Sequence, residues 1–148
     1  DPRPVPRGPA VIDHALVAKK LAMVETCVRE LDELARPDAM RTDVREERFV
    51  EHTLQIAIQA ALDVASHIVS DERLGEPRTN RELFSLLVRG GVLPEALAER
   101  LGAMAGFRNV LVHGYGDVDL AVVKGVVENR TGDLLDFVRE VRGRNVSR

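Results

Sequence analysis

Apolar residues recur at helical spacing along most of the chain. Between about residues 11 and 35, one apolar stripe has members separated by four or three positions, as on one face of a helix. Its members are Val17, Leu21, Val24, Val28 and Leu31. The pattern stops at Arg36, because the residue before a proline is displaced from the α region. The spacing predicts a first helix over about 11–35.

The second predicted helix, about 46–70, contains the segment IAIQAALDVASHIV, which is apolar on nearly every face and therefore central. Four polar residues interrupt it, each four positions after the last: Gln55, Gln59, Asp63 and His67. Side chains at this spacing form one slowly drifting row. The row has two interpretations. Its members bond neighbouring helices or lie at the surface, or they line a cleft or a subunit interface.

Three further helices follow. Thr79 and Glu82 form a capping box that begins a short helix over 80–89, and a glycine pair ends it. Pro94 begins a fourth helix that runs to about His113. A final helix is predicted over 120–141, with a weak point at Gly132. Because no segment alternates with a period of two, the expected fold is all-α: an up-and-down bundle of four main helices and one short helix.

Composition defines the domain and excludes several protein classes. A proline-rich, flexible leader is expected over 1–10, one helical domain over 11–142 and a flexible basic tail over 143–148. With 24 acidic and 21 basic residues, the chain lacks the excess positive charge of a protein that coats nucleic acid. A single cysteine excludes an internal disulfide, and no apolar run reaches the roughly 20 residues of a membrane-spanning helix. These features favour a cytoplasmic protein.

Most familiar site motifs are absent from the sequence. It has no P-loop, no GxGxxG after a strand, no HExxH and no GxSxG. The four histidines are far apart or lie on different predicted elements, and no carboxylate stands at ligand spacing beside a pair of them. We therefore expect neither a catalytic metal ion nor a cofactor.

The end of the fourth helix is the strongest candidate site. Arg108 falls within the apolar stripe of that helix, so its guanidinium needs a carboxylate, a helix C-terminus or an anionic ligand. Asn109 can orient His113, which stands one turn later in the last helical turn. Tyr115, the only tyrosine, follows directly after Gly114. The structural alternative is an arginine that ties helices together, a capping histidine and a packed loop tyrosine.

The segment RNVLVHGY, residues 108–115, resembles the signature of HEPN domains and specifically that of the HepT-like toxin family. The resemblance extends over LQIAIQAALDVASHIV, GVLPEALAERLGAMAGFRN and the last helix, roughly residues 11–142. It implies a homodimeric, RNA-cleaving toxin of a two-gene toxin–antitoxin system. Its antitoxin would be a minimal nucleotidyltransferase that transfers AMP to the motif tyrosine. On this basis Arg108 and His113 would cleave RNA, Asn109 would support them, and Tyr115 would be modified.

The chemistry of RNA agrees with these residue types. RNA supplies its own nucleophile, the 2′-hydroxyl, so cleavage needs a base, an acid and a cation on the phosphate, but no metal ion. His113 can serve as base or acid, and Arg108 can clamp the phosphate. Because one histidine cannot be both at once, a site shared across a two-fold dimer is attractive. Gln59 and Asp63 would line the same groove.

Two other functions remain open from the sequence. The first is a non-catalytic dimeric module that serves mainly as the partner and modification target of the nucleotidyltransferase. The second is a purely structural bundle in which Arg108 is ion-paired inside the core.

Overall fold

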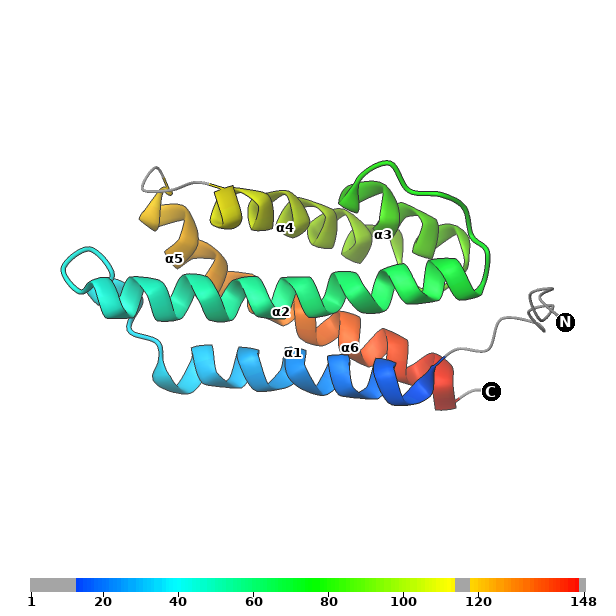
Figure 1. Cartoon of the computed structure of the whole chain (residues 1–148), viewed down its shortest axis with the longest axis horizontal. Coiled ribbons are helices and arrows are strands. Elements are labelled where there is room, and N and C mark those ends of the chain that lie inside the picture. The colour runs from blue at the N-terminus through cyan, green and yellow to red at the C-terminus, as the bar shows by residue number, and fades with distance from the viewer. Residues whose placement is uncertain (1–12, 114–117, 147–148) are drawn as a thin grey trace, which may run out of the picture.

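The computed structural model describes residues 13–113 and 118–146, and within these ranges every regular element is a helix (Figure 1). The all-α prediction is therefore confirmed for this part of the chain. The elements are α1 (His14–Leu34), the 3-10 turn η1 (Pro37–Ala39), α2 (Val44–Asp71), α3 (Asn80–Arg89), α4 (Glu95–His113), α5 (Leu120–Asn129) and α6 (Thr131–Val146). The proposed leader over 1–10 lies outside the described residues.

Side-chain caps fix where four of these helices begin, α1, α2, α3 and α5. The carboxylate of Asp13 accepts a hydrogen bond from the Leu16 amide, 3.0 Å away, at the start of α1. Asp43 caps α2 in the same way, which lets this helix begin two residues before the predicted start. The hydroxyl of Thr79 accepts from the Glu82 amide at 3.0 Å, as the capping box predicts. Short polar side chains thus satisfy amides that the first helical turn leaves without partners.

The prediction of one final helix over 120–141 is wrong, because the chain bends at Arg130 and forms two helices. Arg130 caps α5 through its amide, which donates to the Val126 carbonyl at 2.8 Å, while its own carbonyl accepts from Asp133 in the first turn of α6. Gly132, the predicted weak point, stands directly after this bend and is a poor helix former. The apolar spacing continues through the bend, since α5 and α6 both face the core, and spacing alone therefore did not reveal it.

Helix α6 also continues four residues beyond the predicted domain end at residue 142. Residues 143–146, assigned from the sequence to a flexible tail, form its last turn. Arg144 in this turn donates two hydrogen bonds to Glu72 at the end of α2, at 2.6 and 2.7 Å. The two helix ends are therefore held together by a bidentate ion pair.

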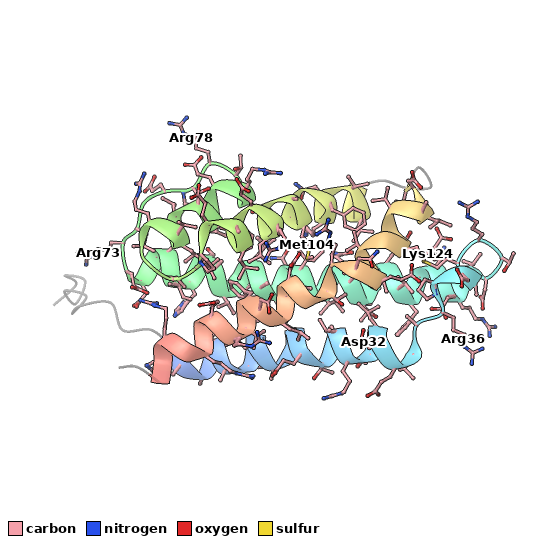
Figure 2. All side chains as sticks on the ribbon, turned by 180° about the vertical axis from the view of Figure 1, so that it is seen from behind. Asp32, Arg36, Arg73, Arg78, Met104 and Lys124 are labelled. Atoms are coloured by element: carbon pink, nitrogen blue, oxygen red, sulfur yellow. The ribbon has the colours of Figure 1, made fainter. Side chains whose placement is uncertain are left out.

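The helices pack around one aliphatic core. α1 and α2 run antiparallel, α3 and α4 pack on each other and on α2, and α6 crosses α1 and α2 on the other side (Figures 1 and 2). Phe84 of α3 and Phe137 of α6 meet edge to face, with ring centroids 6.1 Å apart, so an aromatic contact joins two helices far apart in sequence. Asp32 and Arg78 project into solvent, whereas Met104 points into the protein (Figure 2).

This packing places the C-terminal end of α4 beside α5, at the opposite end of the molecule from the start of α1 and the end of α6 (Figure 1). The candidate motif therefore lies where the α4 chain leaves the bundle. None of the described helices combines the length and the apolar character needed to cross a bilayer.

Candidate active site at the end of helix α4

Helix α4 is apolar over most of its circumference between Arg100 and Arg108. No charged residue occurs between these two positions. Gly102 permits close packing against α3, because a Cβ atom at this position would stand 3.0 Å from the Cγ atom of Arg81. One side of α4 is buried against α2, α3 and α6, and its buried side chains are Leu97, Ala98, Leu101, Met104 and Ala105. Arg108 stands one turn after Met104 and therefore lies on the same side of the helix.

Arg108 is half-buried, as its place in the apolar stripe predicts. Its Nε atom is buried and has no hydrogen-bond partner in the described part of the protein. Its Nη1 atom donates to the Oδ1 atom of Asn109 over a long 3.4 Å. A buried donor without a partner costs about 1–3 kcal/mol, and arginine does not escape this cost by losing its proton. The guanidinium is thus held with unused hydrogen-bonding capacity, which suits an anionic ligand.

The other motif residues are placed less completely. Asn109 is exposed and stands one helical turn before His113, the last residue of α4. The His113 side chain and Tyr115 lie outside the described residues, so their proposed roles stay predictions. The helix itself puts residues 109 and 113 on one face of α4, as the spacing predicts.

Gln59 bonds to Asp63, and Asp63 also bonds to α1. The Nε2 atom of Gln59 donates to Asp63 Oδ1 at 2.8 Å, and Lys20 of α1 donates to Asp63 Oδ2 at 2.9 Å. Both residues line a hollow of about 270 Å³ beside the segment 77–80. His67, in the same row, accepts a hydrogen bond from the Asp13 amide at 2.9 Å. Much of the polar row thus bonds neighbouring chain segments.

No hydrogen bond among the described residues joins Gln59 or Asp63 to Arg108, and Arg108 does not line their hollow. The structure therefore brings Arg108 together with Asn109, and Gln59 with Asp63 and Lys20. That the two sets share one groove stays a prediction.

Comparison with known proteins identifies the family. A family model described as ribonuclease HepT-like matches residues 24–141, which is most of the chain. The chain belongs to the ribonuclease HepT-like family. This membership confirms the resemblance drawn from RNVLVHGY and the predicted enzyme class, an endoribonuclease.

Relatives of this HepT-like chain match between 73% and 86% of its length. The mRNA nuclease HepT of Shewanella oneidensis is 27% identical over 128 residues, 86% of this chain and 96% of the relative. The tRNA nuclease HepT of Aphanizomenon flos-aquae is 31% identical over 113 residues, 73% of this chain and 75% of the relative. A solved structure of the tri-AMPylated Shewanella oneidensis HEPN toxin in complex with its MNT antitoxin has a TM-score of 0.79 at 26% identity, over 86% of this chain and 97% of that one.

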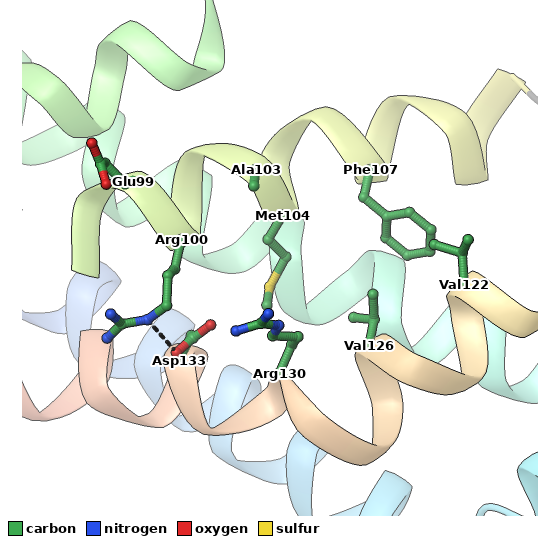
Figure 3. A pocket seen from close by; sticks show the side chains of 9 residues that line it. All are labelled: Glu99, Arg100, Ala103, Met104, Phe107, Val122, Val126, Arg130 and Asp133. Atoms are coloured by element: carbon green, nitrogen blue, oxygen red, sulfur yellow. Dashed lines mark hydrogen bonds and ion pairs between the residues drawn. The ribbon is translucent and has the colours of Figure 1, made fainter. Parts of the chain in front are cut away.

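The HepT-like chain also has a groove that the sequence patterns did not predict. We call it the α4–α5 groove: a cavity of about 400 Å³ lined by Glu99, Arg100, Ala103, Met104, Phe107, Val122, Val126, Arg130 and Asp133 (Figure 3). The bend at Arg130 forms one end of it, so a prediction of one straight helix concealed the groove. The sequence signal for this groove was the run of α4 without charged residues, 101–107, because it includes residues that are exposed in the structure.

A second buried polar group lies on α2. The Oε1 atom of Glu51 is buried and lacks a partner in the described ranges. Burial raises the pKa of the Glu51 carboxyl, and the charge and hydrogen bond of Glu47, one turn earlier, raise it further, whereas Arg48 lowers it. Sequence reasoning did not single out Glu51, because a glutamate within a helix is usually solvated.

Proposed function

We propose that this HepT-like protein is the toxin of a toxin–antitoxin pair and cleaves RNA without a metal ion, using Arg108 and His113. The observation that carries the proposal is the buried Nε atom of Arg108, which has no partner within the described residues and stands little more than one turn before His113. In the structural alternative, Arg108 would be ion-paired in the core, and no ion pair of Arg108 occurs in the described part of the chain.

The reaction needs little beyond these two side chains. The ribose 2′-oxygen attacks the adjacent phosphorus and gives its proton to a base, while the bond from phosphorus to the 5′-oxygen breaks and that oxygen takes a proton from an acid. His113 supplies one of these functions, and the partner copy's motif supplies the other. Arg108 donates to the phosphate oxygens, whose negative charge increases in the transition state. Asn109 supports the arginine through their hydrogen bond.

A homodimer is supported by the outer face of α4. On this face Gly106 is exposed, and Val110 is 48% exposed, close to Arg108 in the sequence. Between Arg100 and Arg108 this helix carries no charged side chain, and a helical segment that is apolar all round is usually covered on all sides. A second copy packed here would bring two motifs together at one groove, which Gln59 and Asp63 would also line.

The dimer is tested with Val110→Glu. We expect this variant to be monomeric by light scattering and to lose RNA cleavage, because a charge would be buried between the copies. Val44→Glu is the matched control, since Val44 is also exposed but lies at the start of α2. A dimeric Val110→Glu protein would contradict this assignment of the interface.

Regulation by an antitoxin is the remaining part of the proposal. The Shewanella oneidensis HEPN toxin is AMPylated and bound to an MNT antitoxin, and Tyr115 is the only tyrosine of this chain. We expect incubation with ATP and the cognate nucleotidyltransferase to add AMP to this protein, as measured by mass spectrometry. Tyr115→Phe should remove the modification, and an adduct that persists in this variant would refute Tyr115 as its position.

Cleavage itself is tested on antitoxin-free protein in the presence of EDTA. The parent should cleave RNA, Arg108→Ala and His113→Ala should lose at least about 100-fold in rate, and His52→Ala should retain it. His52 is exposed on α2 and serves as the matched histidine. A parent that cleaves no RNA but is modified at Tyr115 would instead indicate the non-catalytic module.

A further inference from the structure

We propose that the α4–α5 groove binds one base of the RNA strand and selects bases that carry an exocyclic amino group over uracil. The inference rests on the proposed ribonuclease function and adds a specificity site to it. Its support comes from the walls of the groove, its polar end and its position relative to Arg108.

The walls of the groove suit a flat aromatic ligand. Met104 and Phe107 point into it from α4, and Val122 and Val126 face them from α5 (Figure 3). Single-stranded RNA is bound largely by stacking of its bases on aromatic side chains. Phe107 is half-buried and so offers a ring surface without being enclosed in the core. A cavity of about 400 Å³ has room for one base with its sugar.

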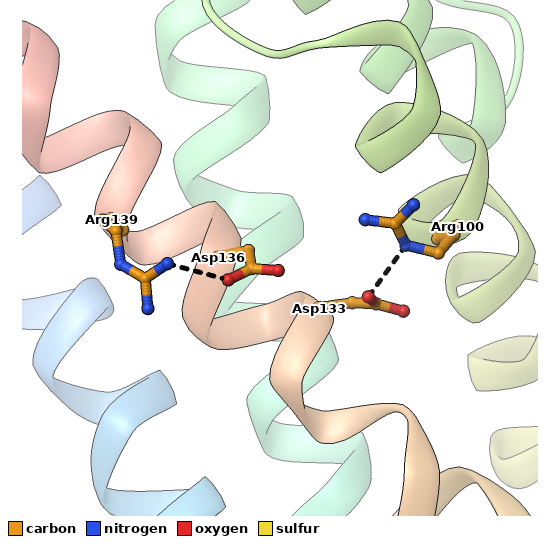
Figure 4. A network of polar contacts seen from close by, with 4 residues as sticks. All are labelled: Arg100, Asp133, Asp136 and Arg139. Carbon is orange, nitrogen blue, oxygen red and sulfur yellow. Dashed lines mark hydrogen bonds and ion pairs between the residues drawn. The ribbon is translucent and has the colours of Figure 1, made fainter.

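The polar end of the groove supplies a hydrogen-bond acceptor. Asp133 Oδ1 accepts from the Nε atom of Arg100 at 2.9 Å (Figures 3 and 4), whereas its Oδ2 atom is buried and has no partner among the described residues. The Asp133 side chain is only 13% exposed. A dry carboxylate oxygen needs a donor, and the amino groups of adenine, cytosine and guanine are such donors. Uracil instead presents carbonyl oxygens on both sides of its one N–H group, and these repel a carboxylate.

Charge at the same end favours a nucleotide over an apolar partner. Arg130 reaches the groove from the bend between α5 and α6 (Figure 3) and forms no ion pair in the described ranges. Its guanidinium is available for an oxygen atom of the bound nucleotide. An apolar helix from a second copy would cover the valines but would leave Asp133 Oδ2 without a donor, so a base fits the groove better.

The groove leads toward the proposed cleavage site. Arg108 follows Phe107 directly and stands one turn beyond Met104, on the same side of α4. Along the helix axis, Phe107 and His113 are separated by about 9 Å. A base stacked on Phe107 would therefore have its neighbouring phosphate near Arg108. The preferred base would occupy one fixed position relative to the cut.

The test measures binding of oligonucleotides that cannot be cleaved. Fluorescein-labelled 2′-O-methyl hexamers of adenine, cytosine or uracil lack the 2′-hydroxyl nucleophile, and fluorescence anisotropy gives their Kd. Cytosine against uracil is the deciding pair, because these two pyrimidines differ only in the amine or carbonyl at C4 and in the proton on the adjacent N3. We expect the cytosine hexamer to bind about tenfold more tightly than the uracil hexamer.

Two variants separate the roles of the groove. Asp133→Asn keeps an oxygen for Arg100 and replaces the free acceptor by a donor, so the preference for cytosine over uracil should disappear or reverse. Its control is Asp136→Asn, because Asp136 also bonds an arginine, Arg139 at 3.1 Å, but lies one turn further along α6 and outside the groove (Figure 4). Phe107→Leu should weaken binding of all three hexamers about tenfold. Phe49→Leu is the control and should not weaken it, because Phe49 is also half-buried but lies on α2 and does not line the groove.

Three results would overturn the inference. In the first, the parent binds cytosine and uracil hexamers equally. In the second, the Asp133→Asn protein keeps the parent's preference. In the third, both groove variants lose binding and their oligomeric mass also changes. The last result would assign the groove to a protein interface. Because the hexamers cannot be cleaved, a base preference in a parent that fails to cleave RNA would support the groove and refute the proposed function.

Discussion

Arg144 and Glu72 join the ends of α6 and α2 through two parallel hydrogen bonds, 2.6 and 2.7 Å long. Both side chains are about four-fifths buried, and the bond to Glu72 raises the pKa of Arg144 above its ordinary value. Arg108 is also half-buried, but its Nε atom has no partner among the described residues. The fold therefore satisfies Arg144, whereas Arg108 keeps a buried donor without a partner in the described ranges.

Loss of the satisfied arginine should destabilise the protein. We expect Arg144→Met to lower the free energy of unfolding by about 2 kcal/mol, because a largely buried carboxylate loses a bidentate partner. Urea denaturation followed by circular dichroism measures this. Arg139→Met is the control, since the exposed Arg139–Asp136 pair should contribute under about 0.5 kcal/mol. Equal effects of the two variants would show that the Glu72 pair does not stabilise the helix ends.

Arg108→Met should show the opposite pattern. The variant removes a buried donor without a partner but also loses part of the arginine side chain's packing, and since these two effects oppose each other we expect the free energy of unfolding to change by less than about 1 kcal/mol. RNA cleavage should fall at least about 100-fold, because the phosphate loses its cation. A loss of stability as large as that of Arg144→Met, with cleavage retained, would indicate a structural role.

Glu51 should make stability depend on pH. Burial and Glu47 raise the pKa of its carboxyl in the folded state, so folding favours the protonated form. Glu51 therefore destabilises the protein as the pH rises above the ordinary pKa of a glutamate, about 4.3. We expect Glu51→Gln to be more stable than the parent by about 1 kcal/mol at pH 7. The difference should shrink toward pH 4.

Chemical denaturation at pH 4 and pH 7 measures this effect on both proteins. The control is Glu33→Gln, an exposed glutamate on α1. A gain from Glu51→Gln that is equal at the two pH values would show that ionisation of Glu51 is not its source.

The contact between Phe84 and Phe137 should couple α3 to α6 energetically. We expect Phe137→Leu to cost about 1–3 kcal/mol, because the smaller side chain fills the core less completely. A double-mutant cycle with Phe84→Leu should give a coupling of about 0.5–1.5 kcal/mol for the edge-to-face pair. Additive effects of the two substitutions would mean that the rings contribute only through burial.

The sequence predicted the helices most accurately where a local signal marks their ends. Thr79 and Glu82 define the start of α3, and Pro94 precedes α4, because capping and proline geometry act within one turn. The bend at Arg130 was missed because it depends on how α6 packs on α1 and α2. Apolar spacing continued across it, and a poor helix former at Gly132 was the only local sign.

The candidate site was predictable in part for the same reason. The half-burial of Arg108 follows from its position in the stripe that includes Met104, which is a property of one helix. The partner of Asp63 was not predictable, since Lys20 comes from a helix 43 residues away. Asp133 and Phe107 line the same groove only because the chain turns at Arg130. Their proximity depends on tertiary packing, so no local sequence pattern predicts it.

The helix that begins the described fold and the helix that ends it meet at one end of the molecule, opposite the motif end of α4 (Figure 1). An engineered domain attached before α1 or after α6 would therefore project away from the proposed RNA-cleaving site. The same geometry makes the chain a good subject for circular permutation. A short linker could connect α6 to α1, with new termini opened in the exposed segment 75–79 between α2 and α3.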